Sequence, residues 1–415
     1  MDAPLVPVAE QKKGTLLSGL ILLFLLAMIL ANLGGNMYGP LMSLYIKDLG
    51  ASVPQIGLFF TLSSVIPLAL QILGGWVSDS IGRLRAIAFG SVAGSLAYVA
   101  LILAPTWEWL LLGSAFFAMG SSLVGPSFDA FIAEHSDEDN RARMFGLTQA
   151  IFMVVGVAGP VLGGWLAKGY GFKFMLIVAG LLYAFATIIR VGMARDAAQG
   201  AGASTHKPLT LAGLGANLRA MFALLAGGGV LTWILITDGI RDTSFALSMN
   251  LLSVFMQEFG KLDLTQIGLT NSVFGLFVML TTIPAGWLAD KAGERVAIAV
   301  GFLLIGISIG GLVVLPPAVL WMYAAGWALA GVGVGLISPA YQSLISKAVP
   351  AHLRGTAFGL FSTSLGLISL PAPWLGAELW QQVGPRFPFL ITAAVSILSI
   401  IPIWLKFKLP DGKQQ

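Results

Sequence analysis

Three charged residues are spaced so that they would share one face of an apolar helix. Asp238, Arg241 and Asp242 belong to the segment TDGIRDT, inside an apolar run that extends to about Gln257. The i, i+3, i+4 spacing places them on one side of a helix, at a depth where a charge must be paired or face water. The three charges sum to −1, so uptake of one proton would neutralise the cluster. The cluster predicts a site for proton coupling or substrate binding; the alternative is a structural ion pair with one spare carboxylate.

Other polar residues lie in separate apolar runs. Asp129 is about one helical turn inside Glu134, where it could act in coupling or could reach water as an interfacial carboxylate. Amide and phenol side chains are expected to line a polar substrate cavity at the same depth as the charged cluster. These residues are Asn32, Asn36, Asn250, Tyr341 and Gln342. Arg190, near the end of its apolar run, is expected to snorkel to the inner membrane surface.

The composition is that of a polytopic membrane protein. The chain has 415 residues, of which 57% are apolar and only 10% are charged, whereas a soluble domain has about 25% charged residues. The absence of cysteine excludes disulfides, thiolate metal sites and thiol catalysis. No nucleophile–base pair, metal-ligand cluster or nucleotide-binding loop is apparent, so we expect neither an enzyme nor a cofactor. The pI of about 9.3 is attributed to scattered basic loops and not to nucleic-acid binding.

Breaking the apolar runs at charges and at Pro/Gly loops gives twelve membrane-spanning helices of about 20 residues or more. The first six are expected near 15–45, 54–78, 86–104, 109–133, 144–167 and 171–193. The second six are expected near 226–257, 266–289, 296–315, 318–346, 355–379 and 387–405. The domain prediction is therefore a bundle over 1–193, a polar cytoplasmic linker over 194–221 and a second bundle over 222–415.

Loop charges predict the orientation. Seventeen of the 23 Lys and Arg residues fall on one side of the expected membrane, five fall on the other, and Arg241 lies within a helix. The five expected outer residues are Lys47, Lys168, Lys173, Lys261 and Arg386. Because basic residues concentrate in cytoplasmic loops, both termini are expected in the cytoplasm. The protein itself is expected in the inner (cytoplasmic) membrane. Six helices in each half then give the halves the same orientation, related by a pseudo-two-fold axis along the membrane normal.

A loop segment is written twice. GGWVSDSIGRLR, over 74–85, recurs as AGWLADKAGER, over 285–295, an offset of 211 residues. The glycines Gly75 and Gly286 are expected to let a helix end approach a neighbour closely. The candidate residues of this cytoplasmic gate motif are Gly75, Asp79, Gly82, Arg83, Gly286, Asp290 and Gly293. Further matches at an offset of 213 relate 141–163 to 354–376, which indicates a duplicated protein.

With these motifs the chain resembles the major facilitator superfamily of transporters. The resemblance implies two six-helix bundles, a cavity lined by helices 1, 4, 7 and 10, and a loop that latches the cytoplasmic side in the outward-open state. The chain departs from the family pattern at Ser80 and Leu84, where basic residues are usual, and at Glu294, which replaces an arginine. These departures predict a weaker latch.

A second motif lies in the fifth expected helix. Gly159-Pro160-Val161-Leu162-Gly163-Gly164 resembles an element of drug/proton antiporters in this superfamily, and Gly156 departs from the spacing of its fuller form. The candidate residues are Gly159, Pro160, Gly163 and Gly164. Glycines on one face permit close packing of helices and the proline bends the helix, so generic packing is the alternative to a role in export.

The resulting prediction is an all-helical secondary transporter that works by alternating access as a monomer. Its expected partners are a small-molecule substrate, protons and the lipid bilayer. Efflux of a drug-like, amphipathic compound is the leading hypothesis. Uptake of a sugar, organic acid or other polar metabolite is the alternative, and an anionic substrate would suit Arg241. A transporter-like membrane sensor is a third hypothesis, from a different class.

Overall fold

The computed structural model describes residues 19–134, 138–200, 230–348 and 366–407. Every regular element in these ranges is an α-helix or a short 3₁₀ helix, and they contain no strand. The first half comprises α1 (Gly19–Tyr38), η1 (Gly39–Leu41), α2 (Met42–Asp48), α3 (Val53–Ile81), α4 (Arg83–Leu103), η2 (Trp107–Trp109), α5 (Leu110–Glu134), α6 (Glu138–Tyr170) and α7 (Phe172–Gly200). The second half comprises α9 (Val230–Ser248), η3 (Met249–Leu251), α10 (Leu252–Glu258), α11 (Leu264–Ala292), α12 (Glu294–Leu312), α13 (Leu320–Ala348), α15 (Ala372–Gln382), α16 (Phe387–Leu398) and α17 (Ile400–Lys406).

The helices agree with the twelve predicted spans. Within the described ranges, nine helical segments are long and apolar enough to cross a bilayer. The span predicted over 54–78 corresponds to α3, whose side chains are described only in part. The spans predicted over 226–257 and 355–379 begin in residues outside the described ranges. Helix α7 extends to Gly200, so the first seven residues of the predicted linker are helical, and 201–221 lie outside the described residues.

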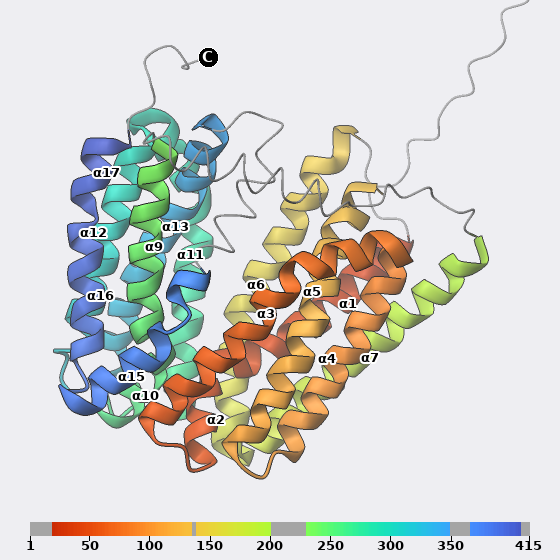
Figure 1. Ribbon diagram of the computed structural model, residues 1–415, viewed down its shortest axis with the longest axis horizontal. Helices are drawn as coiled ribbons and strands as arrows, with labels where there is room; N and C mark the ends of the chain where they lie inside the picture. The colour runs from red at the N-terminus through yellow and green to blue at the C-terminus, as the bar shows by residue number, and fades with distance from the viewer. Residues whose placement is uncertain (1–18, 135–137, 201–229, 349–365, 408–415) are drawn as a thin grey trace, which may run out of the picture.

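The two halves repeat the same helix packing. In the first half α1 packs against α6 and α7, α4 against α5 and α7, and α3 against α5. In the second half α9 packs against α15 and α16, α12 against α13 and α16, and α11 against α13. Each of these pairs has its counterpart in the duplicated sequence. The protein is thus built from two bundles of like topology, which Figure 1 shows as red-to-yellow and green-to-blue groups of helices.

Two equivalent seams join the halves, one between α6 and α11 and the other between α3 and α15. At the first seam the Val161 backbone N–H donates to Ser272 Oγ over 3.0 Å. At the second, the Trp374 N–H donates to Thr61 Oγ1 over 3.1 Å. Thr61 and Ser272 are 211 residues apart, and Val161 and Trp374 are 213 apart. These are the offsets of the sequence repeat, so the seams are related by the internal pseudo-symmetry.

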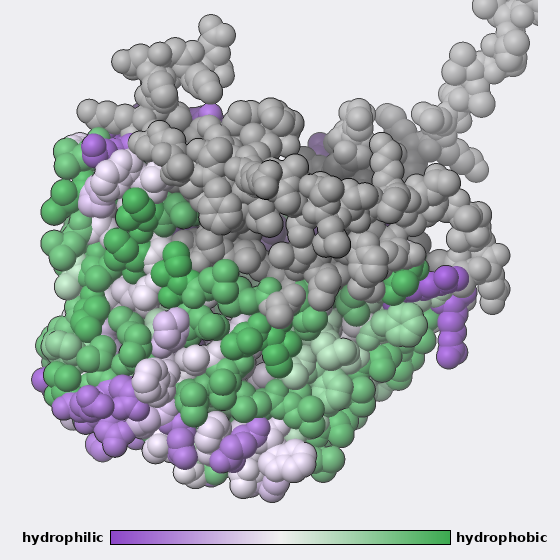
Figure 2. All heavy atoms as spheres, in the orientation of Figure 1, coloured by the Kyte–Doolittle hydropathy of each residue, from purple (hydrophilic) through white to green (hydrophobic). Residues whose placement is uncertain are grey.

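Two ion pairs join the described residues of the halves at one end of the molecule, where α2 and α10 lie together in Figure 1. Lys47 forms an ion pair with Glu258, with Nζ 2.8 Å from Oε1, and also donates to Gln257 Oε1 over 3.1 Å. Lys168 pairs with Asp263 over 2.9 Å. Figure 2 shows hydrophilic residues at this end beside a broad hydrophobic surface over the helices. Lys47 and Lys168 are two of the five basic residues expected on the outer face, so the halves meet at the predicted outer end.

Candidate transport site

The charged cluster predicted in the second half forms on α9. Arg241 Nη2 lies 2.7 Å from Asp238 Oδ1 and 2.6 Å from Asp242 Oδ1. Arg241 Nε also donates to Asp242 Oδ1 over 3.0 Å. The side chain of Asp242 is 35% exposed, against 13% for Asp238. The cluster therefore has one arginine between two carboxylates, and Asp242 is the carboxylate more accessible to water.

Aromatic rings from two other helices surround the arginine of this cluster. The Arg241 guanidinium lies 5.6 Å from the centre of the Tyr341 ring on α13 and 5.9 Å from that of Phe302 on α12. Such contacts stabilise a buried cation. Tyr341, predicted to line the cavity, thus lies beside the cluster, whereas Phe302 carries no sequence signal that separates it from other core phenylalanines. Two carboxylates already pair with Arg241, which disfavours a role for it in binding an anionic substrate.

Three of the other predicted residues meet in a cavity of about 720 Å³ inside the first half. Asn32 and Asn36 line it from α1 and Asp129 lines it from α5. The Asn32 amide donates to the carbonyl of Met28, and that of Asn36 donates to the carbonyl of Asn32, each over 2.9 Å. Each amide uses one of its two N–H groups in this way, which leaves the other N–H and the amide oxygen for a ligand. Gln149 of α6 also lines the cavity and was missed by the sequence reasoning.

Arg190 lines the same cavity, and the prediction that it snorkels to the membrane surface is wrong. The residue is only 4% exposed, and its Nη1 donates to Ser91 Oγ of α4 over 3.0 Å. Tyr183, about two turns earlier on α7, lies beside it. The physical reason is the length of α7, which continues to Gly200. Arg190 therefore lies about 15 Å from the end of its helix, and a buried hydroxyl from α4 is nearer than the surface.

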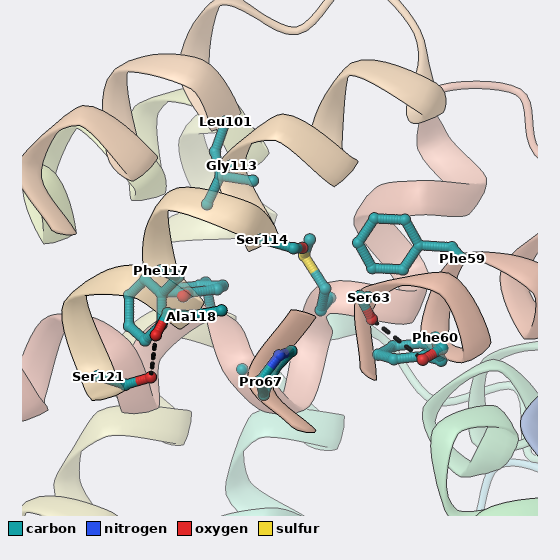
Figure 3. Close-up of a pocket in the computed structure, with 13 residues that line it drawn as sticks. Phe59, Phe60, Ser63, Pro67, Leu101, Gly113, Ser114, Phe117, Ala118 and Ser121 are labelled. Atoms are coloured by element: carbon teal, nitrogen blue, oxygen red, sulfur yellow. Dashed lines mark hydrogen bonds between the residues drawn. The ribbon is translucent and has the colours of Figure 1, made fainter. Parts of the chain in front are cut away.

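A smaller hollow of about 270 Å³ adjoins the cavity and is drawn in Figure 3. Rings of Phe59, Phe60 and Phe117 line it, together with the hydroxyl groups of Ser63, Ser114 and Ser121. The Ser63 and Ser121 hydroxyls donate to the carbonyls of Phe60 and Ala118, each over 3.1 Å. The hollow shares four lining residues with the larger cavity, namely Tyr38, Gly39, Phe117 and Ser121. The two spaces are thus neighbouring parts of one region between α1, α3 and α5.

The remaining predicted cavity residues lie elsewhere. Asn250 is in η3, between α9 and α10, where it is half-buried. Gln342 is exposed on α13, directly after the buried Tyr341. Neither residue lines the cavity of the first half. In the described part of the chain, no group of three or more histidine, aspartate or glutamate side chains could hold a metal ion.

The repeated loop forms equivalent turns in the two halves. Gly82 joins α3 to α4 with φ of 90°, and Gly293 joins α11 to α12 with φ of 91°. Side chains rarely tolerate this conformation, so both turns require glycine. Glu294, which departs from the family pattern, forms an ion pair with Lys347 and accepts a hydrogen bond from Ser343 Oγ over 2.8 Å.

The structure describes the other residues of the loop motif only in part. No described atom lies within 4 Å of the position that a Cβ would take at Gly286. The expected close approach of a helix at Gly286 is therefore not seen among the described residues and stays a prediction. The side chains of Asp79 and Asp290, and the surroundings of Gly75, lie outside the described part of the chain. Arg83 is the first residue of α4.

The glycines of the second motif serve two faces of α6. A Cβ on Gly159 or Gly163 would collide with Asn36 or Met37 of the α1 segment. A Cβ on Gly164 would collide with the carbonyl of Leu264 on α11, in the other half. Pro160 lies within α6, and its carbonyl contacts Gly268 of α11. The motif therefore packs α6 simultaneously against its own bundle and against the opposite bundle.

These features define a helical membrane transporter with two repeated bundles, a polar cavity and buried ionisable groups. The protein-family model described as Major Facilitator Superfamily matches residues 24–240 and 234–415 of this chain. The chain belongs to this superfamily. It is an integral, multi-pass membrane transporter of a small molecule, and not an enzyme.

Individual relatives and a solved structure agree with this assignment. The chain is 27% identical over 384 residues to the multi-drug resistance efflux pump PmrA homolog of Lactococcus lactis subsp. lactis (strain IL1403), covering 89% of this chain and 90% of the relative. It is 28% identical over 314 residues to the class E tetracycline resistance protein of Escherichia coli, covering 75% and 74%. A bacterial homologue of the iron transporter ferroportin, solved in an inward-facing state, superposes with a TM-score of 0.76 at 16% identity, covering 94% of this chain and 99% of the other. This last likeness shows the fold alone.

Proposed function

We propose that the protein exports drug-like, amphipathic compounds in exchange for protons. The observation that carries this proposal is the cluster of Asp238, Arg241 and Asp242, whose fixed charges sum to −1 within a membrane-spanning helix. The names of two relatives, a multi-drug efflux pump and a tetracycline resistance protein, support export of such compounds. The polar cavity and the adjoining aromatic hollow would provide surfaces for both parts of an amphipathic molecule.

Asp242 is the proposed proton acceptor because it is the more exposed carboxylate. Its protonation would weaken the hydrogen bonds that its Oδ1 accepts from Arg241, while Asp238 would keep the arginine charge paired. Movement of Arg241 relative to Tyr341 and Phe302 would then change the packing of α9 against α12 and α13. Protonation at the cluster would in this way alter the packing of the second bundle during alternating access.

The orientation and assembly are part of the same proposal. The excess of Lys and Arg on one side of the spans supports a cytoplasmic location for both termini and an inner-membrane location for the protein. One chain holds both halves of the pathway, which supports a monomer with bundles over 1–193 and 222–415. Uptake of a polar metabolite is the second candidate, favoured by the amide side chains of Asn32, Asn36 and Gln149 in the cavity.

The proposal is tested in liposomes that contain a trapped pH dye. Drug-like cations, aromatic acids, sugars and organic acids are screened for proton movement coupled to substrate movement. We expect a drug-like compound and protons to move in opposite directions in the wild type. Asp242→Asn should lower the coupled proton flux at least ten-fold, and Asp238→Asn should reduce transport as well, because it leaves Arg241 with one carboxylate fewer.

The matched control is Glu108→Gln, which neutralises an exposed carboxylate in η2 outside both candidate sites. This variant should transport like the wild type. Substrate transport without proton movement, unchanged in both aspartate variants, would refute proton coupling. Protons and a sugar moving in the same direction would favour the uptake alternative.

A further inference from the structure

We propose that the cavity of the first half binds the acidic group of an aromatic amphipathic anion, with Arg190 as its cationic partner. This inference rests on the proposed function and specifies the chemical class of one set of substrates. It also moves the anion-binding role from Arg241, where the sequence suggested it, to a different helix in the other bundle.

Arg190 is a buried cation in α7. In the described part of the chain, Arg190 has no carboxylate within ion-pair distance, although it is only 4% exposed. Its hydrogen-bond partners are neutral hydroxyl groups, those of Ser91 and Tyr183. Arg241, by comparison, has two carboxylates within 2.7 Å. A guanidinium in a membrane-spanning helix is costly unless its charge is compensated, and a carboxylate ligand would supply the compensation with paired hydrogen bonds.

A ligand can reach this charge through the cavity of the first half. Arg190 lines the cavity of about 720 Å³, which lies in the size range of small-molecule sites. The cavity follows α1 from Met28 to Tyr38, about 15 Å along the helix axis. A ligand of several rings or a short chain therefore fits between the arginine and the far end. Asp129 lines the same cavity without pairing with Arg190, and its carboxylate would repel an anion.

The smaller hollow beside the cavity offers aromatic rings to the apolar part of the ligand. The adjoining hollow presents rings of Phe59, Phe60 and Phe117 (Figure 3). Tyr38, which lines both spaces, packs edge-on against Phe117 with ring centres 6.1 Å apart. Aromatic groups bind such rings edge-to-face or by offset stacking. The region thus has a cationic group in one space and aromatic rings in the other. This arrangement matches an aromatic carboxylate better than a sugar, for which the ring-lined hollow offers few polar groups.

The test compares three probes of one shape: 2-naphthoate, 2-naphthylmethylammonium and 2-naphthylmethanol. Binding to the purified full-length protein in lipid nanodiscs is measured by equilibrium dialysis, which needs no transport. We expect Arg190→Gln to weaken naphthoate binding about ten-fold or more, the loss typical of a charge-assisted hydrogen bond. Binding of the neutral alcohol to the same sample should stay within about two-fold, which also shows that the variant is folded, and binding of the cation should not weaken.

Three further variants sharpen the result. Arg190→Lys keeps the charge without the bidentate geometry and should retain part of the affinity for naphthoate. Asp129→Asn removes the repelling carboxylate and should strengthen naphthoate binding. Arg143→Gln, an exposed arginine of α6 in the same bundle, is the matched control and should change nothing.

Equal naphthoate affinity in the wild type and in Arg190→Gln would overturn the inference. Displacement of naphthoate by millimolar sodium phosphate alone would also overturn it, because the site would then hold a simple inorganic anion. Both results leave proton-coupled export intact if the liposome assay shows it with cationic compounds. Conversely, binding of naphthoate that depends on Arg190, without proton-coupled export of any compound, would refute the proposed function and keep the anion site.

Discussion

Arg190 and Arg241 both lie well inside their helices, and only Arg241 could be assigned its charged partners from the sequence. Asp238 lies about one helical turn before Arg241, and Asp242 directly follows it in the sequence. Helical spacing alone therefore brings the three side chains together. Arg190 is held by Ser91, which is 99 residues away. No local pattern reports such a contact. Local clusters of the site could therefore be predicted, whereas the surroundings of an isolated charge depended on how α4 and α7 pack.

The same contrast applies to the repeated loop glycines. The duplicated motif predicted special roles for Gly82, Gly286 and Gly293 alike. The structure assigns a backbone reason to Gly82 and Gly293, whose φ values are 90° and 91°. Gly286 lies within α11 and has open space around it among the described atoms. A sequence repeat shows that a glycine is present twice, but the backbone conformation shows whether a side chain would be tolerated there.

This difference gives a prediction at the residue scale. Gly82→Ala should destabilise the protein by about 1–3 kcal/mol, because alanine must adopt a backbone conformation that is reached almost only by glycine. Gly286→Ala should have little effect or stabilise slightly, because alanine favours the helix and meets no atom of the described residues. The apparent Tm of both variants in detergent, measured by tryptophan fluorescence, checks the result. Equal losses of stability in the two variants would contradict the backbone argument.

At the scale of elements, twelve helices followed from the apolar runs because a bilayer imposes a minimum helix length. Their contacts required the structure. At both seams a glycine on one helix contacts a proline-containing helix of the other half, Gly268 at Pro160 and Gly57 at Pro373. The motif of α6 therefore has a physical role in joining the halves, beyond packing within its own bundle. The corresponding segment of α15 has Ala377 where α6 has Gly164, so the two seams are similar but not identical.

The start of α11 provides a prediction of pH dependence. Asp263 caps this helix, accepting from the Gln266 N–H over 3.0 Å, and pairs with Lys168 of α6. Burial by itself would raise the pKa of Asp263, but the hydrogen bonds from Lys168 and from the helix N-terminus outweigh it and hold the pKa below its ordinary value of 3.8. A carboxylate with a lowered pKa stabilises the folded state above its ordinary pKa. That stabilisation is lost as the pH falls through the lowered value.

Lys168→Ala should therefore lower the apparent Tm at pH 6, where Asp263 is ionised in the wild type. The effect should be small, at most about 1 kcal/mol, because the pair is partly exposed. The difference between the wild type and the variant should shrink as the pH falls below 3.8 and Asp263 becomes protonated. Lys173→Ala, which removes another lysine of the first half, is the control. A difference that stays constant down to the most acidic pH at which the protein is folded would exclude Asp263 as the titrating partner.

At the scale of the whole molecule, the internal repeat explains why the outer contacts occur where they do. Lys47 and Gln257, which contact each other, are 210 residues apart, close to the repeat offset. Residues related by a two-fold axis touch only near that axis, so α2 and α10 meet where the pseudo-symmetry axis leaves the outer face. The sequence predicted the axis and its direction. It did not predict which end of the molecule would be joined, because that depends on the position of the bundles in the transport cycle.

The ion pair at this axis leads to a prediction about the cycle. Lys47 and Glu258 are each about one-third exposed, so their attraction is modest, but it acts only when the outer ends are together. Lys47→Glu should place two like charges in contact and favour separation of the outer ends.

Because the natural chain has no cysteine, a single Ser253→Cys reports the change through its rate of labelling by a water-soluble maleimide. In the structure the Ser253 hydroxyl donates to the carbonyl of Pro40 across this interface over 2.7 Å. Labelling should accelerate in Lys47→Glu and return toward the original rate in Lys47→Glu combined with Glu258→Lys, which restores the attraction in reverse. Acceleration that persists in the reversed pair would mean that Lys47 acts through its shape or hydration, and that its charge does not hold the outer ends together.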